Sequence, residues 1–170
     1  TVVAMTVAFG AALGMLVEGH ALDAAISGKL MARVASGALP FHRVTSGNLQ
    51  APRPGAEEAP RAGNFPSPDA LLTASSIARA AHDPDIRIEP AWKVSLVYGM
   101  PCAVYHQFQP AYYLAARFAD DFESAVLHAV NGGGQNLARA MLTGALAGAQ
   151  VGLKGIPPRL IEGLADHEAL

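Results

Sequence analysis

The spacing of apolar residues along the chain predicts α-helices. The clearest case is the stretch DFESAVLHAVN, which ends at Asn131. Its apolar residues recur at intervals of three and four, the spacing of one helix face: Phe122, Ala125, Val126, Ala129 and Val130. Asp120 and Glu123 form a pair typical of a capping box. Gly132 is expected to end this helix.

The same spacing predicts further helices before and after this one. They cover residues 1–17, 21–34, a stretch opened by Ser67, Pro68 and Asp69, a stretch from Pro90 that Pro101 ends near Met100, and residues 135–153 and 159–164. No alternating run typical of a strand occurs, and no internal repeat. The expected fold class is therefore all-α, a multi-helix bundle. Small residues on one flank of the 135–153 helix predict a close helix neighbour: Gly144, Ala145, Gly148 and Ala149.

Helical spacing is lost between residues 37 and 67. Five prolines interrupt this stretch: Pro40, Pro52, Pro54, Pro60 and Pro66. Segments of this length without secondary structure are usually functional or disordered. We expect an irregular, protease-sensitive insert.

The first seventeen residues contain no charged side chain. They are too few to span a membrane with ease, and no basic segment typical of a signal peptide precedes them. The favoured interpretation is a buried helix, protected from hydrogen exchange between Val3 and Leu16. An apolar helix needs cover on all sides, which indicates a missing N-terminal part of the domain or a partner, including a second copy. Residues 1–170 are accordingly either one all-α domain or the C-terminal half of a larger one.

Composition narrows the function classes. Hydrophobic residues make up 51% and charged residues 15% of the 170, which is typical of an ordered globular chain. The net charge is −2 and basic residues are scattered, which argues against nucleic acid as a partner. Cys102 is the only cysteine, so an intrachain disulfide and a cysteine-only zinc site are excluded. We expect an intracellular, cytoplasmic protein that does not bind a membrane.

Three glycines, Gly132, Gly133 and Gly134, separate two predicted helices, and Gln135 and Asn136 follow them. One interpretation is a helix corner in which Gly132 is left-handed. A second is a cradle for an anion or a ribose at the helix N-terminus. A metal loop is disfavoured because the turn has no carboxylate. A standard nucleotide loop is excluded, since no lysine follows the glycines and a helix precedes them.

The remaining candidates are better explained by packing. No two histidines are four residues apart: His20, His42, His82, His106, His128 and His167. The aromatic stretch from Tyr105 to Tyr113 is more typical of packing at a helix break than of a ligand pocket. The acidic residues of 82–85 are explained by an Asp-Pro turn, and Asp120 with Asp121 by helix capping.

From the glycines onward the sequence resembles a known family. The stretch AVNGGGQNLARAMLTGALAGAQVGLKGIPPRLIEGL is similar to the C-terminal signature of the ADP-ribosylglycohydrolases and their crystallin relatives. That signature reads A-V-N-x-G-G-D-T-D-T, followed by G-A-L-A-G-A, I-P and L-x-G-L. The likeness covers 121–164. It implies an all-α fold and a two-magnesium site that hydrolyses a bond to ADP-ribose, with half of the metal ligands from the aspartates and threonine of this signature.

The chain departs from the signature where the family binds metal. Gln135 replaces the first aspartate, Asn136 the first threonine, Leu137 the second aspartate and Ala138 the second threonine. We therefore predict no magnesium and no other cofactor, with no assignable catalytic residue. An ADP-ribose-like ligand or nucleotide is expected at Asn131, Gly132, Gly133, Gly134, Gln135 and Asn136. The alternatives are a structural or interaction protein of crystallin type, and a metal-independent hydrolase of another substrate.

Overall fold

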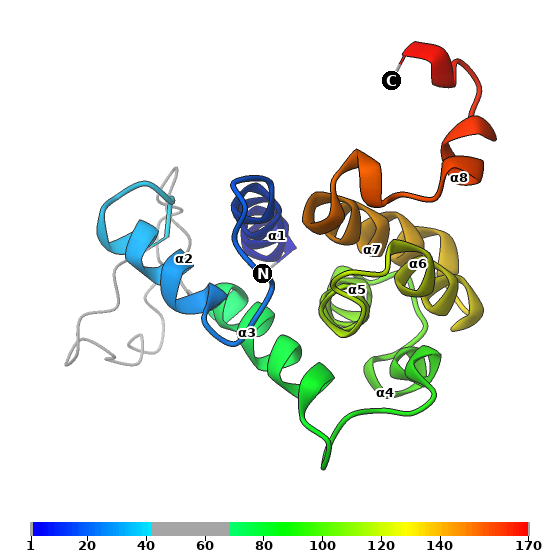
Figure 1. Ribbon diagram of the computed structural model, residues 1–170. Coiled ribbons are helices and arrows are strands. Elements are labelled where there is room, and N and C mark those ends of the chain that lie inside the picture. Colours follow the sequence, from blue (N-terminus) through cyan, green and yellow to red (C-terminus); the bar gives the residue numbers. More distant parts are fainter. Residues whose placement is uncertain (1, 42–68, 170) are drawn as a thin grey trace.

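The computed structural model describes residues 2–41 and 69–169, and these residues form an all-α bundle (Figure 1). They contain eight α-helices and no strand, which confirms the predicted fold class. The helices are α1 (Val2–Val17), α2 (Ile26–Ala35), α3 (Asp69–His82), α4 (Val94–Tyr98), α5 (Val104–Arg117), α6 (Phe122–Asn131), α7 (Asn136–Val151) and α8 (Pro158–Glu162). Short 3-10 helices cover 91–93, 153–155 and 167–169.

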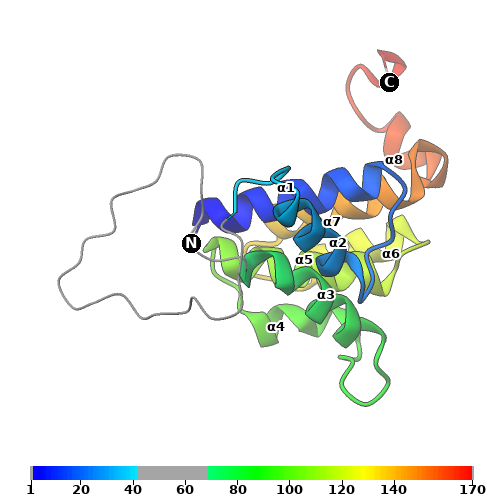
Figure 2. The same cartoon turned by 90° about the vertical axis from the view of Figure 1, so that its left-hand side faces the viewer.

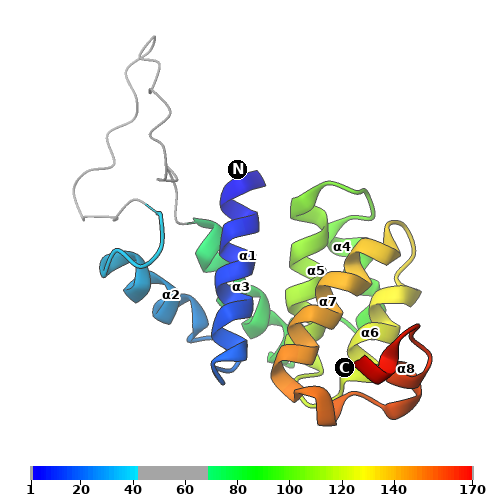
Figure 3. The ribbon, with the colours of Figure 1, turned by 90° about the horizontal axis from the view of Figure 1, so that it is seen from above.

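Helix α5 lies at the centre, in contact with α1, α3, α4, α6 and α7, as Figure 3 shows from above. All seven residues of 110–116 are buried. Phe108 stacks on Phe9 of α1 with ring centroids 4.8 Å apart, and the hydroxyl of Tyr113 accepts the Ile88 N–H at 2.7 Å. The aromatic stretch therefore packs the core. It does so inside a continuous helix, so the expected break at this stretch is wrong: Pro110 is tolerated within α5.

Other helices cover one face of helix α1. Its buried residues are Ala4, Ala8, Phe9, Ala12, Met15 and Leu16. The helix packs against α3, α5 and α7, and Figure 2 shows it running along the bundle. Val2, Val3 and Val17 remain exposed. The buried helix is confirmed on one face, and cover of the other face stays a prediction. Among the described residues, no helix has both the length and the apolar character needed to cross a membrane.

Several predicted boundaries need correction. The second helix begins at Ile26 rather than at residue 21, because Asp23 accepts the Ala25 N–H at 2.8 Å and holds a turn before it. The predicted cap at Ser67 and nearly all of the 37–67 insert lie outside the described residues. The fourth helix ends at Tyr98, just before Met100, as Pro101 predicted. The long helix ends at Val151, because Gly152 has a φ of +66°.

The small residues of α7 allow α6 to approach closely. A Cβ built on Gly148 would lie 3.6 Å from the Phe122 ring, and one on Gly144 would lie 3.7 Å from Val126. Both positions are thus in ordinary contact with α6, as predicted. Ala145 is exposed and takes no part in this packing.

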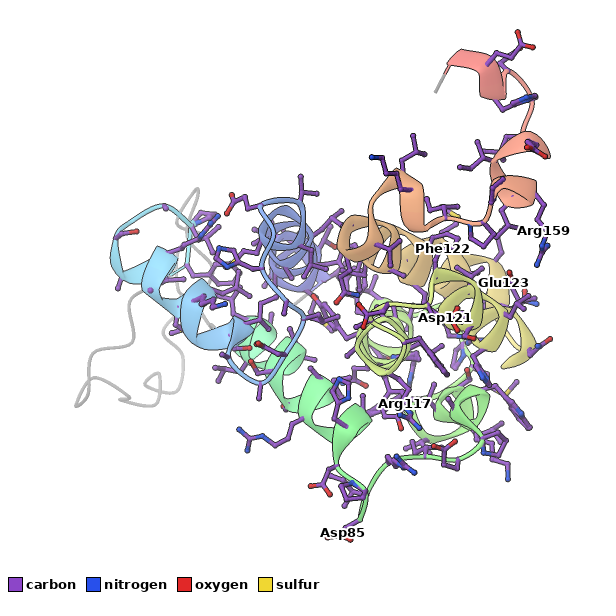
Figure 4. All side chains as sticks on the ribbon, in the orientation of Figure 1. Asp85, Arg117, Asp121, Phe122, Glu123 and Arg159 are labelled. Atoms are coloured by element: carbon purple, nitrogen blue, oxygen red, sulfur yellow. The ribbon has the colours of Figure 1, made fainter. Side chains whose placement is uncertain are left out.

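Helix α6 is capped by Asp121, and not by the predicted pair of Asp120 and Glu123. The Asp121 carboxylate accepts the Ser124 N–H at 3.0 Å and the Ser124 hydroxyl at 2.6 Å. Glu123 instead forms an ion pair with Arg159 of α8, and Figure 4 shows both at that edge of the bundle. The two hydrogen bonds from Ser124 lower the pKa of Asp121.

This lowered pKa predicts a pH-dependent cap. Because the folded-state pKa lies below the unfolded one, the stabilisation is complete above about pH 4 and is lost as pH falls through the folded pKa. Asp121→Ala should cost about 1 kcal/mol at neutral pH and less in acid. Asp121→Asn keeps an acceptor without a charge and is the matched control. Urea unfolding at both pH values measures the difference, and a loss that is equal at both would contradict the ionic part of the cap.

Candidate functional site

The glycine turn joins α6 to α7, two helices that pack against each other. Gly132 has an ordinary helical φ of −70°, whereas Gly133 and Gly134 are left-handed at +70° and +59°. The expectation that Gly132 is left-handed is therefore wrong. Gly132 is required by space, because a Cβ there would collide with the hydroxyl of Ser95 and lie 2.9 Å from Nη2 of Arg139.

The turn is seated on the segment between α4 and α5. The Gln135 N–H donates to the Met100 carbonyl at 3.1 Å. A Cβ on Gly134 would lie 2.6 Å from the same oxygen, so only glycine fits there. One N–H of the predicted cradle therefore already has a protein acceptor and is not free for a ligand.

Arg139 lies behind the turn and is fully buried. Its Nε donates to the Ala129 carbonyl at 3.0 Å, and its Nη2 donates to the Gly133 carbonyl. None of the ion pairs within residues 2–41 and 69–169 includes it. Burial lowers the pKa of Arg139, but a guanidinium keeps its proton in proteins. A positive charge therefore lies beneath the glycines.

Arg139 is not among the predicted site residues, although its position in the sequence indicates burial. Its position belongs to the buried stripe of α7, at the helical spacing i, i+4, i+7 and i+8: Arg139, Thr143, Leu146 and Ala147. An arginine on such a stripe is an exception to the rule that charged residues stay outside, and such exceptions indicate a specific role.

Two neutral polar residues are buried in this part of the bundle: Ser95 beside Gly132, and Thr143 one helical turn beyond Arg139 in α7. Ser95 and Thr143 are fully buried, and their hydroxyl oxygens have no hydrogen-bond partner in the described part of the chain. Nη1 of Arg139 is also without a partner there. Neither hydroxyl carries a charge that would neutralise the guanidinium.

The six predicted ligand-binding residues are contiguous in space but differ in exposure. Asn131, Gly134, Gln135 and Asn136 are exposed, Gly133 is half-buried and Gly132 is buried. The Asn136 side chain donates to the Val130 carbonyl at 3.3 Å. The Gln135 side chain does not cap α7. Both amides thus lie on the outer face of the turn.

The side chains at the turn do not provide the ligands that a pair of divalent ions needs. Gln135 and Asn136 are neutral, Leu137 is 71% exposed and has no ligand atom, and Arg139 adds a like charge beneath them. Within the described residues, no group of three or more histidines, cysteines or carboxylates is placed to hold a metal. Hard cations such as Mg²⁺ need several anionic oxygens.

The other candidate residues have local structural roles. Nδ1 of His106 contacts the Tyr98 carbonyl, and His128 stacks on Phe118 at 4.9 Å. The Asp85 N–H donates to the Asp83 carboxylate at 3.0 Å, which is an Asp-Pro turn as predicted. His42 lies outside the described residues.

Comparison with known families covers the whole chain. A family model described as ADP-ribosylglycohydrolase matches residues 1–170, which extends the likeness well beyond 121–164. No curated protein and no solved structure matches the chain.

Proposed function

Because this chain belongs to the ADP-ribosylglycohydrolase family, we propose that it binds an ADP-ribose-like ligand at the turn of Asn131–Asn136 without a magnesium pair. It does not perform the metal-dependent hydrolysis that the family resemblance implies. The observation that carries the proposal is the buried charge of Arg139 beneath a turn that lacks carboxylates.

The electrostatics of the turn oppose a divalent cation. Binding of Mg²⁺ requires dehydration of the ion, which anionic ligands normally offset. Here Gln135 and Asn136 offer only neutral oxygens. The guanidinium of Arg139 repels a cation through a protein interior of low dielectric constant, where Coulomb interactions are stronger than in water. The same charge favours an anion.

The groups on the outer face of the turn suit a nucleotide-type ligand. The amides of Gln135 and Asn136 can both donate and accept hydrogen bonds, as the hydroxyls of a ribose require. The N-terminus of α7, a helix of 16 residues, carries a partial positive charge that favours phosphate. The turn therefore offers hydrogen-bonding groups for the ribose and a favourable electrostatic environment for the phosphates of ADP-ribose, without a metal.

Thermal unfolding with ADP-ribose in the presence of a chelator tests this proposal. We expect the ligand to raise the midpoint temperature in a concentration-dependent manner. The variant with Gln135→Ala and Asn136→Ala removes two hydrogen-bonding side chains and should weaken binding about tenfold or more. Ser76→Ala, at an exposed position of α3, is the matched control and should bind normally. No shift with the unmodified chain would refute the proposal.

A structural or interaction protein is the second candidate function. It is favoured by apolar residues left exposed near the turn: Leu137 is 71% exposed and Met141 is 66% exposed. They lie one helical turn apart on α7, and Val2, Val3 and Val17 of α1 are exposed as well. A second copy or an N-terminal part of the domain would cover such residues. Sedimentation of the chain that reveals a stable oligomer, together with no response to ADP-ribose, would favour this candidate.

A further inference from the structure

We infer that the interior beneath the glycine turn binds a halide ion, chloride or bromide, between the side chains of Arg139 and Ser95. This inference goes beyond the proposed function, because the ion lies inside the bundle and not on the outer face of the turn. It depends on buried donors without acceptors, on a charge without a partner, and on the position of Ser95.

The guanidinium of Arg139 has donors that the protein does not use. A guanidinium has five N–H groups, of which one on Nε donates to the Ala129 carbonyl and one on Nη2 to the Gly133 carbonyl. Nη1 is buried and has no partner among the described residues. Native interiors satisfy nearly all buried polar groups, so an acceptor is expected at Nη1.

Ser95 of α4 lies beside this guanidinium. A Cβ built on Gly132 would collide with the Ser95 hydroxyl and lie 2.9 Å from Nη2 of Arg139, so both groups flank the bare Cα of Gly132. Ser95 is fully buried, and its hydroxyl also lacks a partner in the described part of the chain. The hydroxyl and the guanidinium can both donate to one shared acceptor.

The charge of Arg139 favours an anion over a water molecule as that acceptor. A water molecule would satisfy the donors but leave the guanidinium without a counter-charge, which is costly in a protein interior. None of the ion pairs among the described residues includes Arg139. Arg139 and Ser95 are both fully buried, which favours a single small ion over phosphate or sulfate.

Thermal unfolding of the full chain in sodium chloride, bromide and gluconate at constant ionic strength tests the binding. An ion that binds only the folded chain raises the midpoint temperature, and we expect about 5 °C at a hundred times the dissociation constant. Gluconate is larger and should give no such shift. An equal shift in gluconate, or none in chloride and bromide, would overturn the inference.

Anomalous diffraction from crystals grown in bromide locates the ion. We expect a peak within hydrogen-bonding distance of Nη1 of Arg139 and of the Ser95 hydroxyl. Peaks at other positions only would overturn the inference, even if halides stabilise the chain.

Variants identify the groups that hold the ion. Ser95→Ala should weaken chloride binding about tenfold, and Arg139→Met should abolish it. Thr143→Val is the matched control, because it removes another buried hydroxyl without a partner among the described residues. The Arg139 side chain donates to carbonyls that precede α7, so its guanidinium points away from Thr143. Equal weakening by Ser95→Ala and Thr143→Val would overturn the inference, and this comparison does not require Arg139→Met to fold.

The ion also has an expected effect on the proposed ligand, and this consequence alone rests on the proposed function. A halide that neutralises Arg139 should weaken ADP-ribose binding about fivefold or more relative to gluconate at the same ionic strength. If halides stabilise the chain as expected but ADP-ribose binds in neither salt, the inference stands and the proposed function fails. If ADP-ribose binds equally in both salts and halides give no specific shift, the inference fails and the proposed function stands.

Discussion

Gly134→Val is expected to destabilise the chain by about 3 kcal/mol or more, one of the largest effects of any substitution at the turn. The backbone at Gly134 has a φ of +59°, which costs a β-branched residue about 1–2 kcal/mol. The new Cβ would lie 2.6 Å from the Met100 carbonyl oxygen. That oxygen belongs to the backbone, so the overlap adds about 1–3 kcal/mol. Any shift that relieves it breaks the Gln135–Met100 hydrogen bond.

The matched control for this substitution is Gly37→Val. Gly37 has a φ of +82°, and a Cβ there would meet nothing within 4 Å. It should therefore cost only the conformational part, about 1–2 kcal/mol. Urea unfolding gives both values. An equal loss at the two glycines would show that Met100 does not constrain the turn.

Restoring carboxylates at the turn is expected to restore magnesium affinity only in part. Gln135→Asp adds one carboxylate and leaves Leu137 without a ligand atom. The double variant Gln135→Asp with Leu137→Asp adds two carboxylates. The single and the double variant should each bind Mg²⁺ about tenfold or more tightly than the unmodified chain does. Arg139→Met added to the double variant removes the repulsion and should raise the affinity again. A full magnesium pair is not expected from these two carboxylates, because two divalent ions need more anionic oxygen ligands than two side chains supply.

Calorimetry with Mg²⁺ on these variants measures the effect. Glu162→Gln, at an exposed residue of α8, serves as a charge control. Two bound ions per chain with Gln135→Asp alone would contradict the expectation, since one carboxylate cannot supply the shared shell of two ions.

Local patterns allowed most of the helices to be predicted, because burial of one helix face imposes a regular spacing of apolar residues. The stripe of α6 is the clearest example. The central helix α5 was not predicted, because its sequence contains Pro110 and was interpreted as a helix break. Pro110 nevertheless lies inside α5. Its helix is held by packing of Phe108 and Tyr113 in the core, which outweighs the lost hydrogen bond.

The contacts of the candidate site depend on residues distant in sequence. Met100 and Ser95 lie more than thirty positions before the glycines, and nothing in the local sequence indicates that they pack against the turn. The space that Ser95 occupies explains why Gly132 is needed at an ordinary φ. Helical spacing from Thr143, Leu146 and Ala147 would have placed Arg139 on the buried stripe, but the prediction did not include it, because the resemblance drew attention to Gln135 and Leu137. The burial of α1 on one face was also not predictable from its own sequence, because it depends on where α5 and α7 lie.

The most direct test of ligand binding without magnesium is a calorimetric titration of ADP-ribose into the unmodified chain, once with a chelator and once with Mg²⁺. We expect the same affinity in both titrations, one ligand per chain, and no hydrolysis of an ADP-ribosylated substrate in either buffer. Binding that requires Mg²⁺, or hydrolysis that the chelator abolishes, would contradict the account.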